Sequence, residues 1–212
     1  NGFATVIVTP GPLTSIVVTP NPATLPVGQL QQFTAVGKDA SGNVLSFTPV
    51  WTVVAGGGTI NSTGLFVAGA TLGTFANTVK ATSGSVSGTA TVTVTLGALA
   101  TITVTPNPAI MAIGATQQMI AEGKDAGGNI VAITPVWSVV NSGGVIDPST
   151  GIFTAGLVAG TFNNTVVATS GTISGTATIT VTPVLVTITV TPNPASVIVN
   201  GTLVTEPEEI AD

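Results

Sequence analysis

The hexapeptide TVTPNP occupies residues 103–108 and recurs at residues 189–194, and the near-copy VVTPNP occupies residues 17–22. Each of the first two copies along the chain is followed by a full series of alternating apolar segments and turns. The last copy is followed only by residues 195–212. An internal repeat of this kind defines the unit that folds.

The repeat has a period of 86 residues that lengthens to 87 partway along the unit. The change falls where GGGTINSTGLF in the first copy corresponds to GGVIDPSTGIF in the second, which has one additional residue in that turn. The positions spaced by 86 include Pro20, Pro106 and Pro192, and Trp51 and Trp137, whereas Phe75 and Phe162 are spaced by 87. We therefore predict two tandem domains, residues 10–95 and residues 96–182, called below the first and the second repeat.

Each repeat is predicted to be an all-β domain. Short segments of alternating apolar and polar residues are separated by Gly, Pro, Asn and Ser, and no segment has helical periodicity. Seven short strands in a unit of this length are typical of an immunoglobulin-like β-sandwich. The strands expected in the first repeat are about 14–19, 29–37, 45–54, 58–60, 65–68, 74–82 and 86–95.

Comparison of the two copies separates buried positions from exposed ones. A pair that stays apolar is expected to be buried, whereas a pair in which one copy carries a charge is expected to face water. The pairs predicted to be buried are Phe33/Met119, Ala35/Ala121, Val79/Val166 and Ala81/Ala168, and those predicted to be exposed are Val36/Glu122 and Lys80/Val167. Trp51 and Trp137 are predicted to be buried on a central strand, where their size fills the core.

The pattern "ITVTPNPA…G…QQ…A.GKDA.GN…PVW…G.I…TG.F.AG…G…VVATSG..SGTATITV" resembles the bacterial Ig-like domain, group 2. This family occurs in intimin- and invasin-type adhesins and in some phage structural proteins. The resemblance covers nearly the whole chain. It implies an extracellular, multi-domain, stalk-like protein whose repeats act mostly as spacers and share no catalytic residues.

The composition indicates an uncharged surface that is rich in threonine. Only 5% of the residues are charged, 44% are hydrophobic, and four of the eight acids lie in the terminal segment 206–212. Such a surface cannot follow nucleic acid phosphates or an anionic membrane. It also titrates little with pH, which favours an extracellular or cell-surface location. There is no apolar run of eighteen residues, so no transmembrane helix is expected.

An enzyme is not expected, and neither is a cofactor. The chain has no His, Cys, Tyr or Arg to act as general base, nucleophile or oxyanion donor. The GGG stretch at 56–58 is interpreted as a turn rather than a phosphate cradle, because no helix follows it. The residues that could ligate a calcium ion are Asp39, Asn43, Asp125 and Asn129. The loops GKDASGN and GKDAGGN are better explained as Asx-type hairpin turns, since calcium sites use several carboxylates.

Three N-glycosylation sequons occur, at Asn61 in NST, Asn163 in NNT and Asn200 in NGT. Chains rich in threonine and serine contain such matches often, so these are weak candidates. O-linked sugar on exposed threonines is an equal alternative. An intact mass equal to that of the bare 20.7 kDa chain would exclude both kinds of modification.

The two ends of the chain align with parts of a repeat. Residues 1–9 resemble the last strand of a preceding domain, and residues 183–212 resemble the initial strand or strands of a third repeat, followed by an acidic tail. The chain begins at Asn1, so either a leader has been removed or this is a section of a longer protein. Isolated strands are unstable in water. They are therefore completed by neighbouring repeats of one longer chain or donated to another subunit by β-strand addition, which propagates into a filament.

We therefore expect a structural protein of an extracellular filament or elongated cell-surface fibre. The expected partners are identical subunits or adjacent Ig-like repeats. The alternatives are a stalk, spacer or binding module of a surface adhesin, which would contact cell-surface glycans or proteins, and a phage decoration domain.

Overall fold

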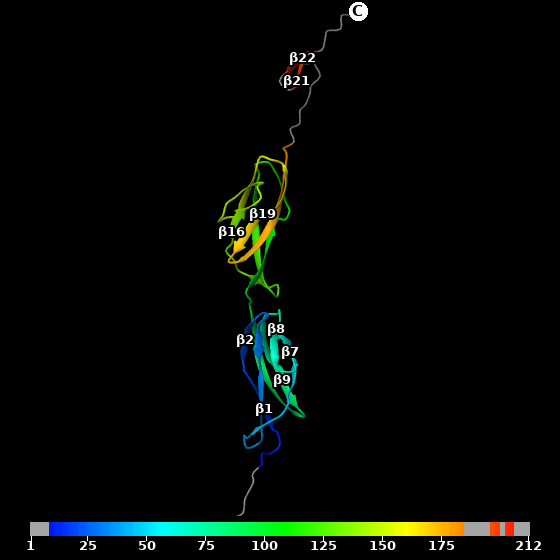
Figure 1. Ribbon diagram of the computed structural model, residues 1–212, viewed down its shortest axis with the longest axis vertical. Coiled ribbons are helices and arrows are strands. Elements are labelled where there is room, and N and C mark those ends of the chain that lie inside the picture. Colours follow the sequence, from blue (N-terminus) through cyan, green and yellow to red (C-terminus); the bar gives the residue numbers. More distant parts are fainter. Residues whose placement is uncertain (1–8, 185–195, 200–201, 206–212) are drawn as a thin grey trace, which may run out of the picture.

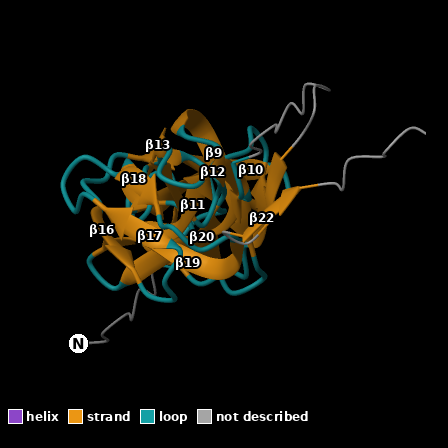
Figure 2. Ribbon diagram, turned by 90° about the horizontal axis from the view of Figure 1, so that it is seen from above, coloured by secondary structure: helices purple, strands orange, loops and turns teal. Residues whose placement is uncertain are grey.

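The computed structural model describes residues 9–184, 196–199 and 202–205 of the 212-residue chain. The described residues form β-strands joined by loops and turns, without a helix (Figure 2). The two repeats are stacked end to end along the long axis of the molecule (Figure 1). The expected all-β, tandem β-sandwich fold is confirmed.

The strands of the two repeats correspond one to one. In the first repeat they are β1 (Ser15–Thr19), β2 (Ala23–Pro26), β3 (Leu30–Gln32), β4 (Thr34–Lys38), β5 (Val44–Leu45), β6 (Val50–Val53), β7 (Gly58–Ile60), β8 (Leu65–Ala68), β9 (Gly73–Ser83) and β10 (Val86–Thr95). In the second repeat they are β11 (Leu99–Thr105), β12 (Ala109–Ala112), β13 (Thr116–Gln118), β14 (Ile120–Asp125), β15 (Ile130–Val131), β16 (Val136–Val139), β17 (Gly144–Ile146), β18 (Ile152–Ala155), β19 (Gly160–Ser170) and β20 (Ile173–Thr182).

Each repeat contains one four-stranded sheet and two three-stranded sheets. In the first repeat the strand orders are β2-β10-β9-β6, β1-β4-β5 and β3-β8-β7. The second repeat has the equivalent orders β12-β20-β19-β16, β11-β14-β15 and β13-β18-β17. Among these sheets, β2 pairs with β10 and β12 with β20 in parallel, and the other pairings are antiparallel. The four-stranded sheet faces the two smaller ones across the core.

Most of the predicted core positions are buried. Phe33 and Met119 are each 1% exposed, and the rings of Phe33 and Phe66 meet edge to face at 5.8 Å. Val79, Val166, Ala81 and Ala168 are fully buried, Ala35 and Ala121 are half-buried, and Val36 and Glu122 are exposed as expected. Lys80 and Val167 differ from the prediction because they are half-buried. They lie on β9 and β19, which have a neighbouring strand on each side.

Two segments that were predicted as single strands are each divided between two sheets. The segment 29–37 breaks at Phe33, whose N–H donates to Gly64 O at 2.8 Å, so that β3 and β4 join different sheets. The alternation of apolar and polar residues does not reveal this change of sheet, because β3 and β4 belong to sheets that border the same core, in which Phe33 is buried. The segment 45–54 is interrupted before Val50 by Pro49, which has no N–H to donate to a ladder.

The tryptophans lie on edge strands, so the prediction of a central strand was wrong. β6 and β16 are the outermost strands of the four-stranded sheets. Trp137 is nevertheless only 5% exposed, and Trp51 is half-buried. A Cβ built on Gly64 would lie 3.0 Å from the indole of Trp51, and one built on Gly151 would lie 2.7 Å from the indole of Trp137. Each indole is therefore covered by a glycine turn rather than by a further strand.

The TPNP motif is the point at which the chain crosses from one sheet to the other. β1 ends at Thr19, and β2, which sequence analysis did not predict, begins at Ala23. Between them Asn21 Oδ1 accepts a hydrogen bond from Thr91 N at 3.0 Å, and Asn21 Nδ2 donates to Thr89 O at 3.3 Å. The side-chain amide thus takes the place of a peptide group in a strand beside β10, and the backbone ladder between β2 and β10 follows directly at Val92.

The second repeat has the same crossing. Asn107 Oδ1 accepts from Thr178 N at 3.0 Å, and Asn107 Nδ2 donates to Thr176 O at 3.3 Å. The two prolines that flank each asparagine cannot donate to a sheet, so the amide supplies the hydrogen bonds that the backbone cannot.

The strands predicted beyond the two repeats lie mostly outside the described residues. This holds for residues 1–8, 185–195, 200–201 and 206–212, which include the sequon at Asn200 and the acidic tail. Of the C-terminal segment, β21 (Ser196–Val199) and β22 (Thr202–Thr205) pair with each other antiparallel. Counted from TPNP, they correspond to β2 and β3, which in the two complete repeats join separate sheets.

Candidate functional site at the joint between the repeats

The GKD turns hold a carboxylate inside a ring of hydrogen-bond donors. Asp39 Oδ1 accepts from the N–H groups of Ser41 and Asn43, each at 2.9 Å. Asp39 Oδ2 accepts from Asn43 Nδ2 at 2.9 Å and from Gly11 N at 2.9 Å. This is the Asx-type hairpin turn that the sequence indicated.

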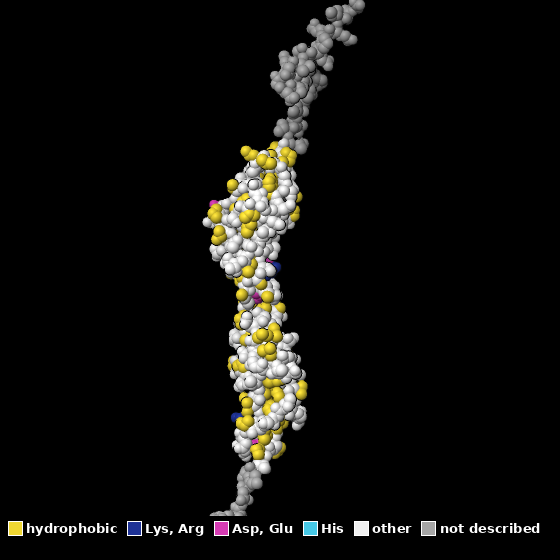
Figure 3. Space-filling model, in the orientation of Figure 1, with side chains coloured by type: hydrophobic (Ala, Val, Ile, Leu, Met, Phe, Trp, Pro, Cys, Tyr) yellow, Lys and Arg dark blue, Asp and Glu magenta, His cyan; other side chains and the backbone are white. Residues whose placement is uncertain are grey.

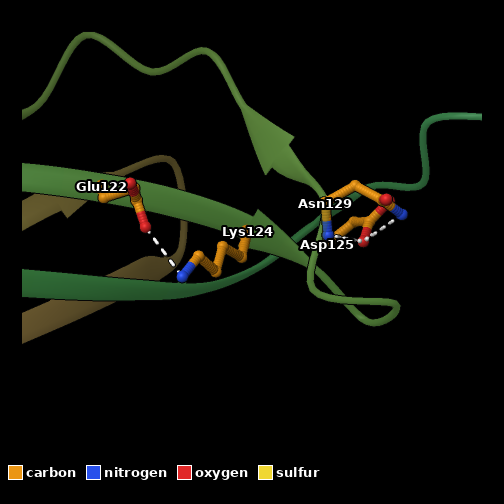
Figure 4. Close-up of polar contacts among 4 residues, drawn as sticks. All are labelled: Glu122, Lys124, Asp125 and Asn129. Atoms are coloured by element: carbon orange, nitrogen blue, oxygen red, sulfur yellow. Dashed lines mark hydrogen bonds and ion pairs between the residues drawn. The ribbon is translucent and has the colours of Figure 1, made fainter. Parts of the chain in front are cut away.

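Asp125 repeats this arrangement in the second repeat. Its Oδ1 accepts from Gly127 N and Asn129 N, each at 2.9 Å, and its Oδ2 accepts from Gly97 N at 3.0 Å. Asn129 Nδ2 lies 3.1 Å from both carboxylate oxygens (Figure 4). Figure 4 also shows the exposed ion pair between Lys124 and Glu122, at 2.8 Å.

The hydrogen bonds keep both carboxyl groups ionised. The Asn43 side chain and the Gly11 N–H, with the other turn amides, lower the pKa of Asp39 from 3.8 to about 2. At Asp125, burial raises the pKa, but the N–H groups of Gly97 and the turn more than offset it, so that the pKa is lowered. Asp147 has a lowered pKa as well, because the backbone N–H groups of Thr150 and Ser149 donate to its carboxylate.

The weak calcium candidates are brought together in pairs, Asp39 with Asn43 and Asp125 with Asn129. Each carboxylate accepts hydrogen bonds on both oxygens, and each asparagine presents its amide nitrogen rather than an oxygen to the carboxylate. Among the described residues, no group of three or more His, Cys, Asp or Glu side chains lies together. This donor pattern fits a turn that is closed by amides better than an oxygen cage.

The carboxylates tie down the segment that enters each repeat. Gly97 belongs to the three residues between the end of β10 at Thr95 and the start of β11 at Leu99. A Cβ on Gly97 would lie 3.3 Å from Val27 Cβ on one side and 3.3 Å from Asp125 Cβ on the other. A side chain at this position would crowd both neighbours, because the entering chain passes between the end of the first repeat and the GKD turn of the second.

The same turn makes a direct contact across the joint. Asn129 Nδ2 donates to Ala70 O at 2.9 Å, and Ala70 lies in the loop between β8 and β9 of the first repeat. A Cβ on Gly127 would lie 3.0 Å from the Cα and Cβ of Ala70. In the first repeat the position of Gly127 is held by Ser41. The serine-to-glycine difference therefore falls where the turn meets a preceding repeat.

At the end of each repeat that lies away from its GKD turn, a glycine turn supports the loop between β8 and β9 or the equivalent loop between β18 and β19. Gly57 and Gly143 have φ values of 84° and 91°, and a Cβ on either would lie within 2.6–2.7 Å of the ring of Phe75 or Phe162. Gly69 N and Gly156 N donate to Gly57 O and Gly143 O respectively. The GGG stretch is thus a turn packed on an aromatic ring.

Two of the predicted sequons lie within the described residues. Asn61 is exposed, but its Oδ1 accepts from Thr63 N, Thr63 Oγ1 and Leu65 N at 2.8–3.0 Å. Asn163 is exposed, whereas Thr165 of the same sequon is fully buried and donates to Ser142 O at 2.6 Å. In the folded repeat, this sequon hydroxyl is therefore inaccessible.

The molecular surface of the described residues is nearly free of charge. Figure 3 shows isolated Lys and acidic side chains on a surface of white and yellow atoms. Threonines along β10 and β20 alternate with buried Val, Ile and Ala, and Thr74 Oγ1 and Thr93 Oγ1 lie 3.0 Å apart across β9 and β10. Among the described residues, no helix is long and apolar enough to cross a membrane.

The GKD turns are evident from the sequence, but their role at the joint was not predicted. The signal was present, because Gly11 and Gly97 precede Asp39 and Asp125 by the same 28 residues. The contact of Asn129 with Ala70 had no such signal, because it joins one copy to the other rather than repeating within each.

No family model matches the chain, so the likeness to the bacterial Ig-like domain, group 2, stays a resemblance. Ice-binding protein 1 of Shewanella frigidimarina (strain NCIMB 400) is 33% identical over 140 residues, which cover 61% of this chain. The chain spans only 15% of the length of that protein.

The solved structures that the chain matches include two cadherins and a surface layer protein. Mouse cadherin-23 EC22–24 has 16% identity and a TM-score of 0.43, and the match covers 80% of this chain and 65% of that one. Drosophila N-cadherin EC1–4 has 15% identity and a TM-score of 0.44, with 82% and 50% covered. Domains 5–6 of the S-layer protein SbsC have 20% identity and a TM-score of 0.35, with 84% and 100% covered.

Proposed function

We propose that the chain is a structural, non-enzymatic segment of an elongated extracellular or cell-surface protein, in which Ig-like repeats are joined end to end as spacers. The observation that carries this proposal is the joint, in which Asp125 fixes the three-residue linker through Gly97 N and Asn129 of the same turn donates to Ala70 O of the first repeat. A short linker that is bonded to the second repeat, together with a direct hydrogen bond between the two repeats, holds the two domains in a defined order and direction.

The surface supports the same proposal. A spacer has to stay folded in changing salt and pH, and a surface with few charges is little affected by either. In the proposed arrangement the partners are adjacent repeats of this chain or identical subunits. Assembly of subunits into a filament by β-strand addition remains the finer hypothesis, and it concerns the segments beyond the two repeats.

A second candidate is binding of a solid or polymeric surface through the threonine rows. Thr91, Thr93 and Thr95 lie on the outward face of β10, with equivalents on β20, and the name of the Shewanella protein motivates the choice of ice as the surface to test. An assay of ice recrystallisation with the chain addresses this candidate. Inhibition that is lost in Thr91→Lys and Thr178→Lys variants would favour it over a spacer.

The joint can be tested by residual dipolar couplings of the two repeats. If the joint is fixed, both repeats of the wild-type chain report one alignment tensor. Asn129→Ala removes the bond to Ala70 O and should let the two tensors diverge. Asn43→Ala is the matched control, because it changes the same turn in the first repeat without touching the joint. Independent tensors in the wild-type chain would refute the proposed spacer function.

A further inference from the structure

The far end of the second repeat exposes two large apolar side chains. Leu157 is 82% exposed and Val158 is 70% exposed, and they lie in the loop between β18 and β19. Beside them is a hollow of about 260 Å³, which is lined by the glycine turn at 143–144, Gly156 and Phe162. Exposed apolar groups that surround a hollow mark an interaction site more often than single exposed residues do.

The repeat itself shows what covers this end of a domain. By the offset of 87, Leu157 and Val158 correspond to Ala70 and Thr71 of the first repeat. Ala70 is the residue that the GKD turn of the second repeat contacts, through Asn129 Nδ2 and Gly127. The end that carries Leu157 is thus the equivalent of a surface that receives the N-terminal turn of another repeat.

We propose that the surface formed by Leu157, Val158 and the adjoining hollow, called here the distal socket, binds the N-terminal GKD turn of another Ig-like repeat of this type. This inference rests on the proposed spacer function and adds to it a specific partner surface. The distal socket presents Leu and Val where the internal joint has Ala and Thr, so its contact is more apolar than the internal joint.

The N-terminal end of the first repeat is complementary to such a socket. It exposes Pro10, Pro12 and Ala40, and Val44 is 68% exposed just after the turn. The carboxylate of Asp39 needs no new partner on docking, because its oxygens already accept hydrogen bonds from Gly11 and the turn, and Lys38 beside it leaves the turn with no net formal charge. A second copy of the chain can therefore serve as the partner in a test, with its Ser41 turn facing Leu157.

Disulfide trapping tests the proposal in the full chain, which has no cysteine of its own. In the internal joint, a Cβ on Gly127 lies 3.0 Å from Ala70 Cβ. Disulfides span about 3.5–4.5 Å between Cβ atoms, so Ala70→Cys/Gly127→Cys should close within one molecule once the turn moves outward by about half an ångström. By the repeat offsets, the equivalent pair for the distal socket is Leu157→Cys/Ser41→Cys, which can only close between molecules. A glutathione redox buffer at millimolar protein concentration lets correct pairs accumulate.

The proposal expects a ladder of head-to-tail oligomers from Leu157→Cys/Ser41→Cys. Leu157→Cys paired with Val136→Cys is the matched control, because Val136 is 63% exposed on a lateral strand, and it should give no ladder above the yield of random collision. Equal yields in the two variants, or monomers alone, would overturn the distal socket. Since Ala70→Cys/Gly127→Cys reports on the internal joint separately, its failure to close would instead count against the proposed spacer function.

Discussion

Replacement of Asn107 by alanine is expected to destabilise the second repeat selectively. The side-chain amide bridges Thr178 N at 3.0 Å and Thr176 O at 3.3 Å, at the place where the chain crosses between sheets. Each such hydrogen bond contributes about 0.5–1.5 kcal/mol net, and both lie at the surface, where water can replace them in part. We therefore expect a loss of about 1–2 kcal/mol, which for a domain of this size lowers Tm by roughly 5–15 °C.

The assay combines calorimetry with amide hydrogen exchange. In Asn107→Ala the transition of the second repeat should move while that of the first repeat stays, and Asn21→Ala should do the reverse. The Thr178 amide should lose its protection in Asn107→Ala, because its acceptor is gone. An unchanged Tm with full protection of this amide would refute the idea that the asparagine acts as part of the sheet.

An isosteric change separates the donor from the acceptor. Asn107→Asp keeps the oxygen that accepts from Thr178 N, but it turns the donor to Thr176 O into a second oxygen. Two oxygens face each other there, so the folded state disfavours the ionised carboxyl and raises its pKa above the ordinary value. The stability deficit relative to wild type should be full above that raised pKa, and should shrink as the pH falls below it and the protonated group donates again.

Three further outcomes are expected. Gly143→Ala places a Cβ 2.7 Å from the Phe162 ring at a φ of 91°, and it should lower the free energy of unfolding in urea by about 2–4 kcal/mol. The control Gly128→Ala has a φ of 84° but open space around it, so it should lower this free energy by only about 1 kcal/mol. Equal losses in the two variants would contradict the ring contact. Thr165→Val leaves Ser142 O and Asn141 N without their partner and should cost about 1–3 kcal/mol in the same assay, while Thr180→Val, at a surface Thr pair, should be nearly neutral. The pKa of Asp39 is lowered from 3.8 to about 2, so the stability that its carboxylate contributes is complete above pH 3.8 and is lost as the pH falls toward 2. Asp39→Asn should therefore lower the Tm of the first repeat at neutral pH and make this Tm depend less on pH between about 4 and 2. An unchanged dependence of Tm on pH would contradict the role of the turn.

The sequence predicted those features that recur in both copies and depend on the nearest neighbours along the chain. Phe33 and Met119, or Val79 and Val166, could be placed in the core because each pair stays apolar. The change of sheet between β3 and β4 could not be predicted, since both strands border the core in which Phe33 is buried, and the apolar pattern therefore continues across it. The recurrence of Asn in every TPNP was visible, but a side chain that replaces a peptide group in a ladder leaves no periodic signal.

Contacts between the two repeats cannot be predicted by aligning the repeats, because such contacts do not recur within each repeat. The difference between Ser41 and Gly127 looks like neutral variation in a turn until Ala70 is seen 3.0 Å from the glycine position. The difference between Ala70 and Leu157 also looks neutral in the sequence, and it can be interpreted only once the loop that carries both residues is seen at the end of a repeat. Positions at which two repeats differ are thus the ones that report on neighbours outside the repeat.

The few carboxylates of the described residues are used mainly to fix backbone turns. Asp39, Asp125 and Asp147 each accept from backbone N–H groups, and only Glu122 forms an ion pair, with Lys124. Carboxylates that are held in this way add rigidity at the joint, and the lysine before Asp39 and before Asp125 leaves each GKD turn with no net formal charge, so neither salt nor pH above about 4 opposes the approach of the ends. If the ends do meet through neutral and apolar surfaces, trapping of the Leu157→Cys/Ser41→Cys variant should be as efficient in high salt as in low salt. A yield that falls steeply with salt would indicate a charged contact elsewhere on the molecule.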